Sequence, residues 1–161
     1  RLGIRTADYG GSLPHIGSYS LQQKTIELLS LRQSLSHSEA GSLFGLPIDG
    51  ALYRSVVAHE IAHAIASQHF AMPTPSLVAQ EYLAYVVQLS TMEPELREKV
   101  LRGCEVLPYK DVEEMSPTYY EMAPSRFGVK AYLHFLSLKN PSAFIHGLLS
   151  GAIKPAGWET E

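Results

Sequence analysis

Two short segments near the N-terminus have the residue types and the partial apolar–polar alternation of β-strands. They cover residues 19–21 and 24–31, and Gln22 and Gln23 between them are predicted to form a turn. Residues 1–17 before them contain four glycines and one proline, which predicts an irregular lead-in.

From residue 51 onward the apolar positions follow helical spacing. The longest predicted helix covers residues 51–70, with Asp49 placed to cap its first turn and Pro73 just beyond its end. The glycine-containing segment 36–50 before it predicts a loop. Further helices are predicted at 77–87, 93–103, 124–138 and 141–149, with a helical turn near 116–117 and a tail at 152–161.

Strands followed by helices favour an α+β fold, with the mainly helical body after the short N-terminal strands. A chain of 161 residues is long enough to bury its own core, so we expect a single domain over residues 1–161.

The composition is that of a globular protein and excludes several classes. Hydrophobic residues make up 45% and charged residues 18%, and the net charge is −3 without a dense basic cluster, so we expect no nucleic-acid partner. No apolar run approaches the roughly 18 residues of a transmembrane helix. Cys104 is the single cysteine, which excludes an internal disulfide and a multi-cysteine zinc site.

The most informative motif is His59-Glu60-Ile61-Ala62-His63, inside the longest predicted helix. Residues four positions apart lie about 40° apart around a helix axis, so both imidazoles can bind one metal ion, with Glu60 beside them. This is the HExxH pattern of zinc peptidases, in which the glutamate is the general base. The alternative is a core helix with polar residues on one stripe, which is costly to bury without partners.

Catalytic zinc usually has three protein ligands and leaves the fourth position for water. We expect the third ligand to be Glu81, because a short turn containing two prolines lets the next helix fold back along the first. Its neighbours are almost all apolar, so its carboxylate needs a partner. The alternatives are His69 and a ligand elsewhere in the chain.

The HExxH motif and the helix segment that begins with Glu81 resemble the gluzincins, the HExxH-plus-glutamate clan of zinc metallopeptidases. The resemblance covers residues 59–87, and in size the chain is also similar to the small bacterial minigluzincins. It implies a zincin-like fold, a Zn²⁺ cofactor held by His59, His63 and Glu81, and hydrolysis of a peptide or protein substrate.

A second resemblance leads to His69. The spacing from His59 to His69 is that of the metzincin motif HExxHxxGxxH, and Met115 begins a segment similar to a metzincin Met-turn. However, Ala66 occupies the position of the glycine that breaks the metzincin helix. On a continued helix, His69 lies about 80° from the ligand face.

The gluzincin resemblance assigns roles in catalysis. We expect Glu60 to take a proton from the metal-activated water and to pass it to the leaving amine. Such sites add a donor for the oxyanion, and we predict Tyr120 and His134 as the candidates. Asp49 and Asp111 are candidates for orienting the ligand imidazoles.

Two functions therefore remain open. An active peptidase requires Glu60, whereas a catalytically inactive zincin-like module that binds zinc and acts in protein interaction does not. For the peptidase, we expect a strand near residues 26–31 to pair with an extended peptide. We also expect a secreted or periplasmic location, with any signal segment outside this chain.

Overall fold

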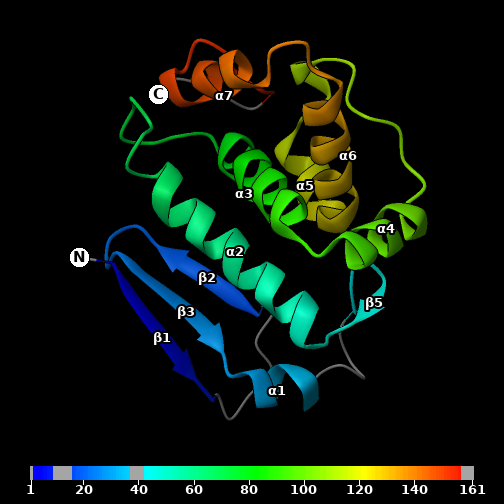
Figure 1. The fold of residues 1–161 in the computed structure, drawn as a ribbon. Helices are drawn as coiled ribbons and strands as arrows, with labels where there is room; N and C mark the ends of the chain where they lie inside the picture. The colour runs from blue at the N-terminus through cyan, green and yellow to red at the C-terminus, as the bar shows by residue number, and fades with distance from the viewer. Residues whose placement is uncertain (1, 9–15, 37–41, 157–161) are drawn as a thin grey trace.

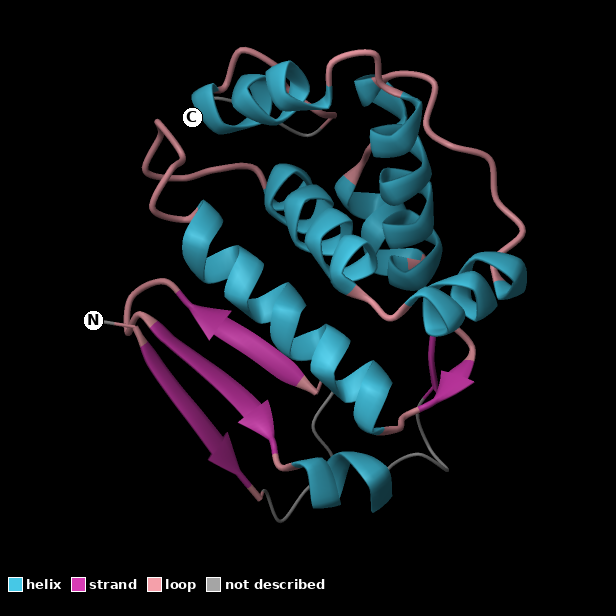
Figure 2. Ribbon diagram, viewed as in Figure 1, coloured by secondary structure: helices cyan, strands magenta, loops and turns pink. Residues whose placement is uncertain are grey.

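The computed structural model describes residues 2–8, 16–36 and 42–156. Short strands come first and a mostly helical body follows, so the predicted α+β class is confirmed (Figure 1, Figure 2). The elements in chain order are β1 (Gly3–Ala7), β2 (Gly17–Ser20), β3 (Thr25–Leu29), α1 (Leu31–Ser36), β4 (Ser42–Leu43), β5 (Leu46–Pro47), α2 (Gly50–Ala66), α3 (Leu77–Thr91), α4 (Pro94–Gly103), the 3₁₀ turn η1 (Val112–Glu114), α5 (Pro117–Met122), α6 (Pro124–Ser137) and α7 (Pro141–Ser150).

The first three strands form one sheet in the order β1-β3-β2, with β1 parallel and β2 antiparallel to β3. Strands β2 and β3 confirm the prediction for this region. The prediction of an irregular lead-in over residues 1–17 is wrong for Gly3–Ala7. Strand β1 forms by pairing in register with β3, Gly3 opposite Thr25, and local glycine content does not report such distant pairing. Residues 9–15 of the lead-in lie outside the described residues.

The segment 36–50, predicted as a loop, contains a small hairpin. Strands β4 and β5 pair around Phe44 and Gly45, whose φ angles are 57° and 75°. Two successive positive φ values are typical of the tight turns that connect antiparallel strands.

Helix α2 lies across one face of the sheet (Figure 1). The contact buries Ile26 and Leu28 of the sheet against Ala64 of the helix. The helix begins as predicted, since the Asp49 side chain accepts a hydrogen bond of 2.7 Å from the Leu52 amide.

Helix α2 ends at Ala66 rather than at residue 70. The Ser67 hydroxyl and the Gln68 side-chain amide both donate to the carbonyl of Ala64. The backbone amides of Gln68 and His69 then bond three residues back instead of four. Side chains that compete for this carbonyl tighten and end the last turn.

Helix α3 is the central helix of the body and packs against both α2 and α6 (Figure 1). Its side chains are buried on almost every face, as those of Tyr82 and Leu89 show. The close approach of α6 depends on Gly128, since a Cβ there would lie 2.3 Å from the Tyr85 ring. Helix α3 is therefore held between α2 on one side and α6 on the other.

The later helices lie close to their predicted positions, and α3 extends to Thr91 rather than to residue 87. In the predicted tail, residues 152–156 form no helix or strand, although Pro155 is fully buried. Across the described ranges, no helix is both long enough and apolar enough to cross a membrane, as expected.

Candidate metal centre

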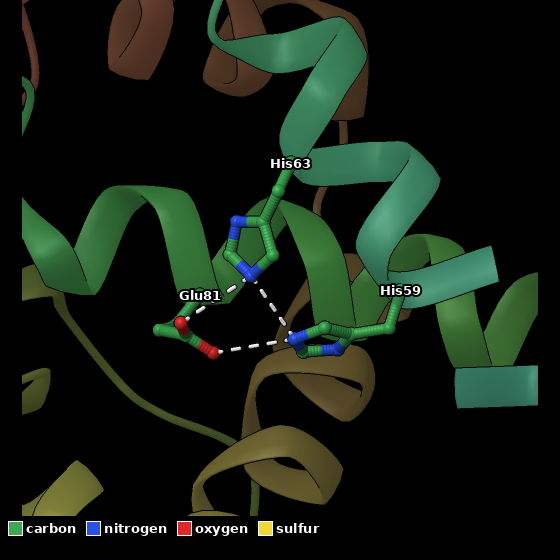
Figure 3. A group of neighbouring side chains, drawn as sticks. All are labelled: His59, His63 and Glu81. Carbon is green, nitrogen blue, oxygen red and sulfur yellow. Dashed lines mark hydrogen bonds and ion pairs between the residues drawn. The ribbon is translucent and has the colours of Figure 1, made fainter. Parts of the chain in front are cut away.

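Three side chains from two neighbouring helices point toward one another: His59 and His63 from α2, and Glu81 from α3 (Figure 3). The two Nε2 atoms are 3.1 Å apart. One Glu81 oxygen lies 3.3 Å from Nε2 of His63, and the other lies 3.5 Å from Nε2 of His59. The side chains are only 8% to 12% exposed, so the cluster is largely shielded from solvent.

These distances fit the donor spacing around a tetrahedral metal ion. Bonds of about 2.0–2.1 Å at the tetrahedral angle place two donors roughly 3.3 Å apart. Within the described part of the chain, the buried Oε2 of Glu81 has no donor in hydrogen-bonding geometry, as expected for an oxygen that faces a cation. Two imidazoles and a carboxylate therefore form a donor set that could hold Zn²⁺ or another divalent transition metal.

The charges in the cluster favour a carboxylate opposite two imidazoles. Burial by itself would raise the pKa of Glu81, but the interactions with His59 and His63 outweigh it and lower this pKa to about 2. Burial would lower the pKa of His63, but Glu81 and, more weakly, Glu60 raise it above its ordinary value. The negative charge of Glu81 therefore favours a proton on His63.

The imidazole of His59 is held on two sides by α3. Its Nδ1 lies 3.0 Å from Oε1 of Gln88, whose amide nitrogen donates to the Ser55 hydroxyl over 3.1 Å. The ring of Tyr85 meets the His59 ring edge to face, with 4.7 Å between the centroids. The helix that provides Glu81 therefore also orients one of the histidines.

Glu60 is buried in the contact between α2 and the sheet, next to the start of β2. A Cβ at Gly17 would lie 2.9 Å from Cγ and 3.1 Å from Oε1 of Glu60. The negative charge of Glu60 contributes to the raised pKa values of His63 and Tyr120, so its carboxylate lies near these two side chains. This is the position expected for a general base that is not itself a ligand.

Tyr120, from α5, is the predicted oxyanion donor that the structure brings to the cluster. Burial raises the pKa of Tyr120 well above its usual value, and the carboxylates of Glu81 and Glu60 raise it further. The Tyr120 hydroxyl therefore stays protonated. It is subject to the negative charges of Glu81 and Glu60, as His63 is.

His134, the other predicted donor, has contacts of a different kind. Its Nδ1 forms a buried hydrogen bond of 2.8 Å with the Tyr82 hydroxyl, and its ring packs edge to face on Phe144. Burial lowers the pKa of His134. These contacts join α6 to α3 and α7, and the structure does not bring His134 into the cluster around Glu81.

The remaining candidates lie elsewhere. His69 is exposed beyond the end of α2 and is not part of the three-residue cluster. Asp49 caps α2, and Asp111 caps the 3₁₀ turn by accepting from the amides of Glu113 and Glu114. The predicted edge strand near residues 26–31 is wrong, because β3 is paired on both sides.

Gln88 and Tyr85 are the contacts of His59 that sequence reasoning missed. Both lie on the helix of Glu81, Tyr85 four and Gln88 seven residues after it, and this spacing returns to one helix face. A polar residue at that spacing in an apolar helix was the available signal for Gln88.

Comparisons with known proteins identify a family for this chain. No curated protein and no solved structure shows a significant match. Residues 4–157 match the protein family described as "Family of unknown function (DUF6639)". Because the match covers nearly the whole chain, the protein belongs to this family.

Proposed function

We propose that the protein is a zinc-dependent peptidase with a zincin-like fold, similar to the gluzincins. The observation that supports this most is the cluster of donors from His59, His63 and Glu81. The two Nε2 atoms are 3.1 Å apart, and each lies 3.3 or 3.5 Å from one of the two Glu81 oxygens. Metal binding alone would not require a buried glutamate directly beside the donors. Glu60 in that place therefore favours hydrolysis over a purely structural site.

In this proposal His59, His63 and Glu81 hold Zn²⁺, which supplies Lewis acidity to the reacting water and to the scissile carbonyl. Glu60 accepts a proton from the water and returns it to the leaving amine. The protonated hydroxyl of Tyr120 donates a hydrogen bond to the oxyanion.

The edge of the sheet offers a place for the substrate. In the described sheet, β1 and β2 are the edge strands, and β2 is the one in contact with α2. Gly17 at the start of β2 lies against Glu60, so a peptide that pairs with β2 would pass close to the proposed base. An extended peptide or an unfolded protein segment is the substrate class that this arrangement suits.

Zinc content and peptide hydrolysis of four proteins test the proposal: wild type, Glu60→Gln, Glu81→Ala and His69→Ala. We expect about one zinc per chain in wild type, Glu60→Gln and His69→Ala, and a strong loss in Glu81→Ala. A peptide library should be cleaved by wild type and His69→Ala, with turnover reduced by about 10²- to 10⁴-fold in Glu60→Gln.

A matched control is Glu98→Gln, at an exposed glutamate of α4, which should behave as wild type. Absence of zinc in the wild type would overturn the metal site, and full turnover in Glu60→Gln would overturn the catalytic assignment. Bound zinc without cleavage of any library peptide would instead support a zinc-binding interaction module.

A further inference from the structure

We infer that Gln88 is a positioning residue that holds His59 in the tautomer with the proton on Nδ1, so that Nε2 presents a lone pair to the metal. The inference depends on the proposed metal site for its purpose. The tautomer itself is a property of the metal-free chain and can be measured without metal or substrate.

The direction of each hydrogen bond follows from a carbonyl in the first turn of α2. The Leu52 carbonyl is an acceptor only, so the Ser55 hydroxyl donates its hydrogen to it over 2.7 Å. The oxygen of Ser55 is then left to accept, and the Gln88 group at 3.1 Å must be the NH₂ end of the amide.

With its NH₂ turned toward Ser55, Gln88 presents Oε1 to His59. This oxygen has no hydrogen to donate, and it lies 3.0 Å from Nδ1. Nδ1 must therefore carry the imidazole proton, and Nε2 of the neutral ring is unprotonated. Nε2 is the atom that faces His63 and Glu81.

Burial makes this orientation persistent. Ser55 is 4% and Gln88 2% exposed, so no bulk water is available to replace a misplaced donor. If the Gln88 amide turned over, the Ser55 hydroxyl would have to leave the Leu52 carbonyl in order to donate to Oε1, and His59 would have to change its tautomer.

The orienting group is a neutral amide. Partners of ligand histidines commonly include a carboxylate, which also makes the imidazole more basic. Gln88 fixes the His59 ring without adding a charge. Glu81 is therefore the single anion among the three candidate ligands and Gln88. A metal held this way keeps more of its positive charge for the substrate.

The experiment is a long-range ¹H–¹⁵N correlation spectrum of histidine-labelled, metal-free protein at alkaline pH. The signals of His59 are assigned by their loss in His59→Gln. Zn²⁺ affinity is measured on the same proteins by competition with a chromogenic chelator. The proteins are wild type, Gln88→Glu, Gln88→Met and Ser55→Ala, with Gln80→Met as the matched control.

We expect the Nδ1–H tautomer in wild type, Gln88→Glu and Gln80→Met. Gln88→Met removes the acceptor, and both the tautomer preference and zinc affinity should fall, the affinity by about 10- to 100-fold. Ser55→Ala touches no atom of His59, yet it frees the amide to turn over and should give a mixture of tautomers. Gln80 is on the same helix and bonds to the Pro75 carbonyl, so its loss should change neither readout.

The Nε2–H tautomer in wild type would overturn the inference, and so would an unchanged tautomer in both Gln88→Met and Ser55→Ala. If Gln88→Met does not fold, Ser55→Ala alone decides, because it removes one hydroxyl and leaves Gln88 in place. A wild type with the expected tautomer and no zinc affinity would refute the proposed function and leave the orienting role of Gln88 intact.

Discussion

Gly17 lies directly against Glu60: a Cβ on Gly17 would come within 2.9 Å of Cγ and 3.1 Å of Oε1 of the glutamate. The same Cβ would come 2.8 Å from Cδ2 of Leu28, so no empty space is available on that side. The edge strand therefore leaves room for the Glu60 carboxylate only because this residue has no side chain.

We predict that Gly17→Ala displaces Glu60 and lowers kcat by about 10- to 100-fold, because misplacing a catalytic group by a fraction of an ångström is costly. Zinc content should not change, since Glu60 is not a ligand. Gly3→Ala is the control, because Gly3 lies on the opposite edge strand β1 and its Cβ would meet only the Thr25 side chain. Equal turnover in Gly17→Ala and wild type would show that Glu60 does not need its present position.

Replacing Tyr120 by phenylalanine should reduce kcat by about 10²- to 10³-fold, the usual effect of removing one oxyanion donor. Zinc affinity should change little, because the hydroxyl is not one of the three donors. Tyr119→Phe is the matched control: the neighbouring ring packs on Tyr109. Steady-state kinetics on a cleaved peptide measures both variants, and equal losses would argue against a specific role for Tyr120.

Zinc affinity should fall in acid, because protons compete with the metal for His63. Burial acts against protonation, but Glu81 and Glu60 raise the pKa of His63 above its ordinary value of 6.5. As the pH is lowered, zinc affinity should therefore begin to fall while the pH is still above 6.5. The expected slope is about tenfold per pH unit for each proton that the metal must displace. Chelator competition across pH measures the slope, and a flat profile would contradict a histidine ligand with a raised pKa.

The metal-free protein should show a different pH dependence of its free energy of unfolding. A raised pKa of His63 stabilises the fold below pH 6.5, and this stabilisation is lost as the pH rises through the folded-state value. The lowered pKa of Glu81 stabilises the fold at pH values above 4.5, its ordinary pKa. This stabilisation is lost as the pH falls toward the folded-state pKa of about 2. The pair therefore contributes most between pH 4.5 and 6.5.

Urea unfolding of metal-free wild type and Glu81→Gln across pH tests this. The difference between the two proteins should be largest inside that window and should shrink on both sides. A difference that keeps growing above pH 6.5 would contradict the coupling of the two groups.

Gly128→Ala should destabilise the fold, because its Cβ would lie 2.3 Å from the Tyr85 ring. Overpacking of this kind costs about 1–3 kcal/mol, more than the gain in helix propensity of about 1 kcal/mol. Since Tyr85 packs on His59, zinc affinity should fall as well. Gly103→Ala in α4, where the nearest atom is 3.9 Å away, should not lower the thermal unfolding temperature and should leave zinc affinity unchanged.

Local pattern was sufficient for most of the helices and for both histidines of the candidate metal centre. Asp49 caps α2 as predicted, and the spacing of His59 and His63 places both imidazoles on one side of that helix. The unpartnered charge of Glu81 in an apolar helix was also visible locally, and α3 brings it to the histidines as predicted. These features depend on neighbours within one or two helical turns, which a sequence displays directly.

Tertiary structure decided the rest, because distant segments had to meet. Pairing with β3 makes a strand of Gly3–Ala7, and it leaves β2 at the edge of the sheet beside Glu60. The fold separates Tyr120 from His134 by packing the first near Glu81 and bonding the second to Tyr82. Gln88 orients His59 only because α3 lies along α2, a relation between two helices that neither helix contains by itself.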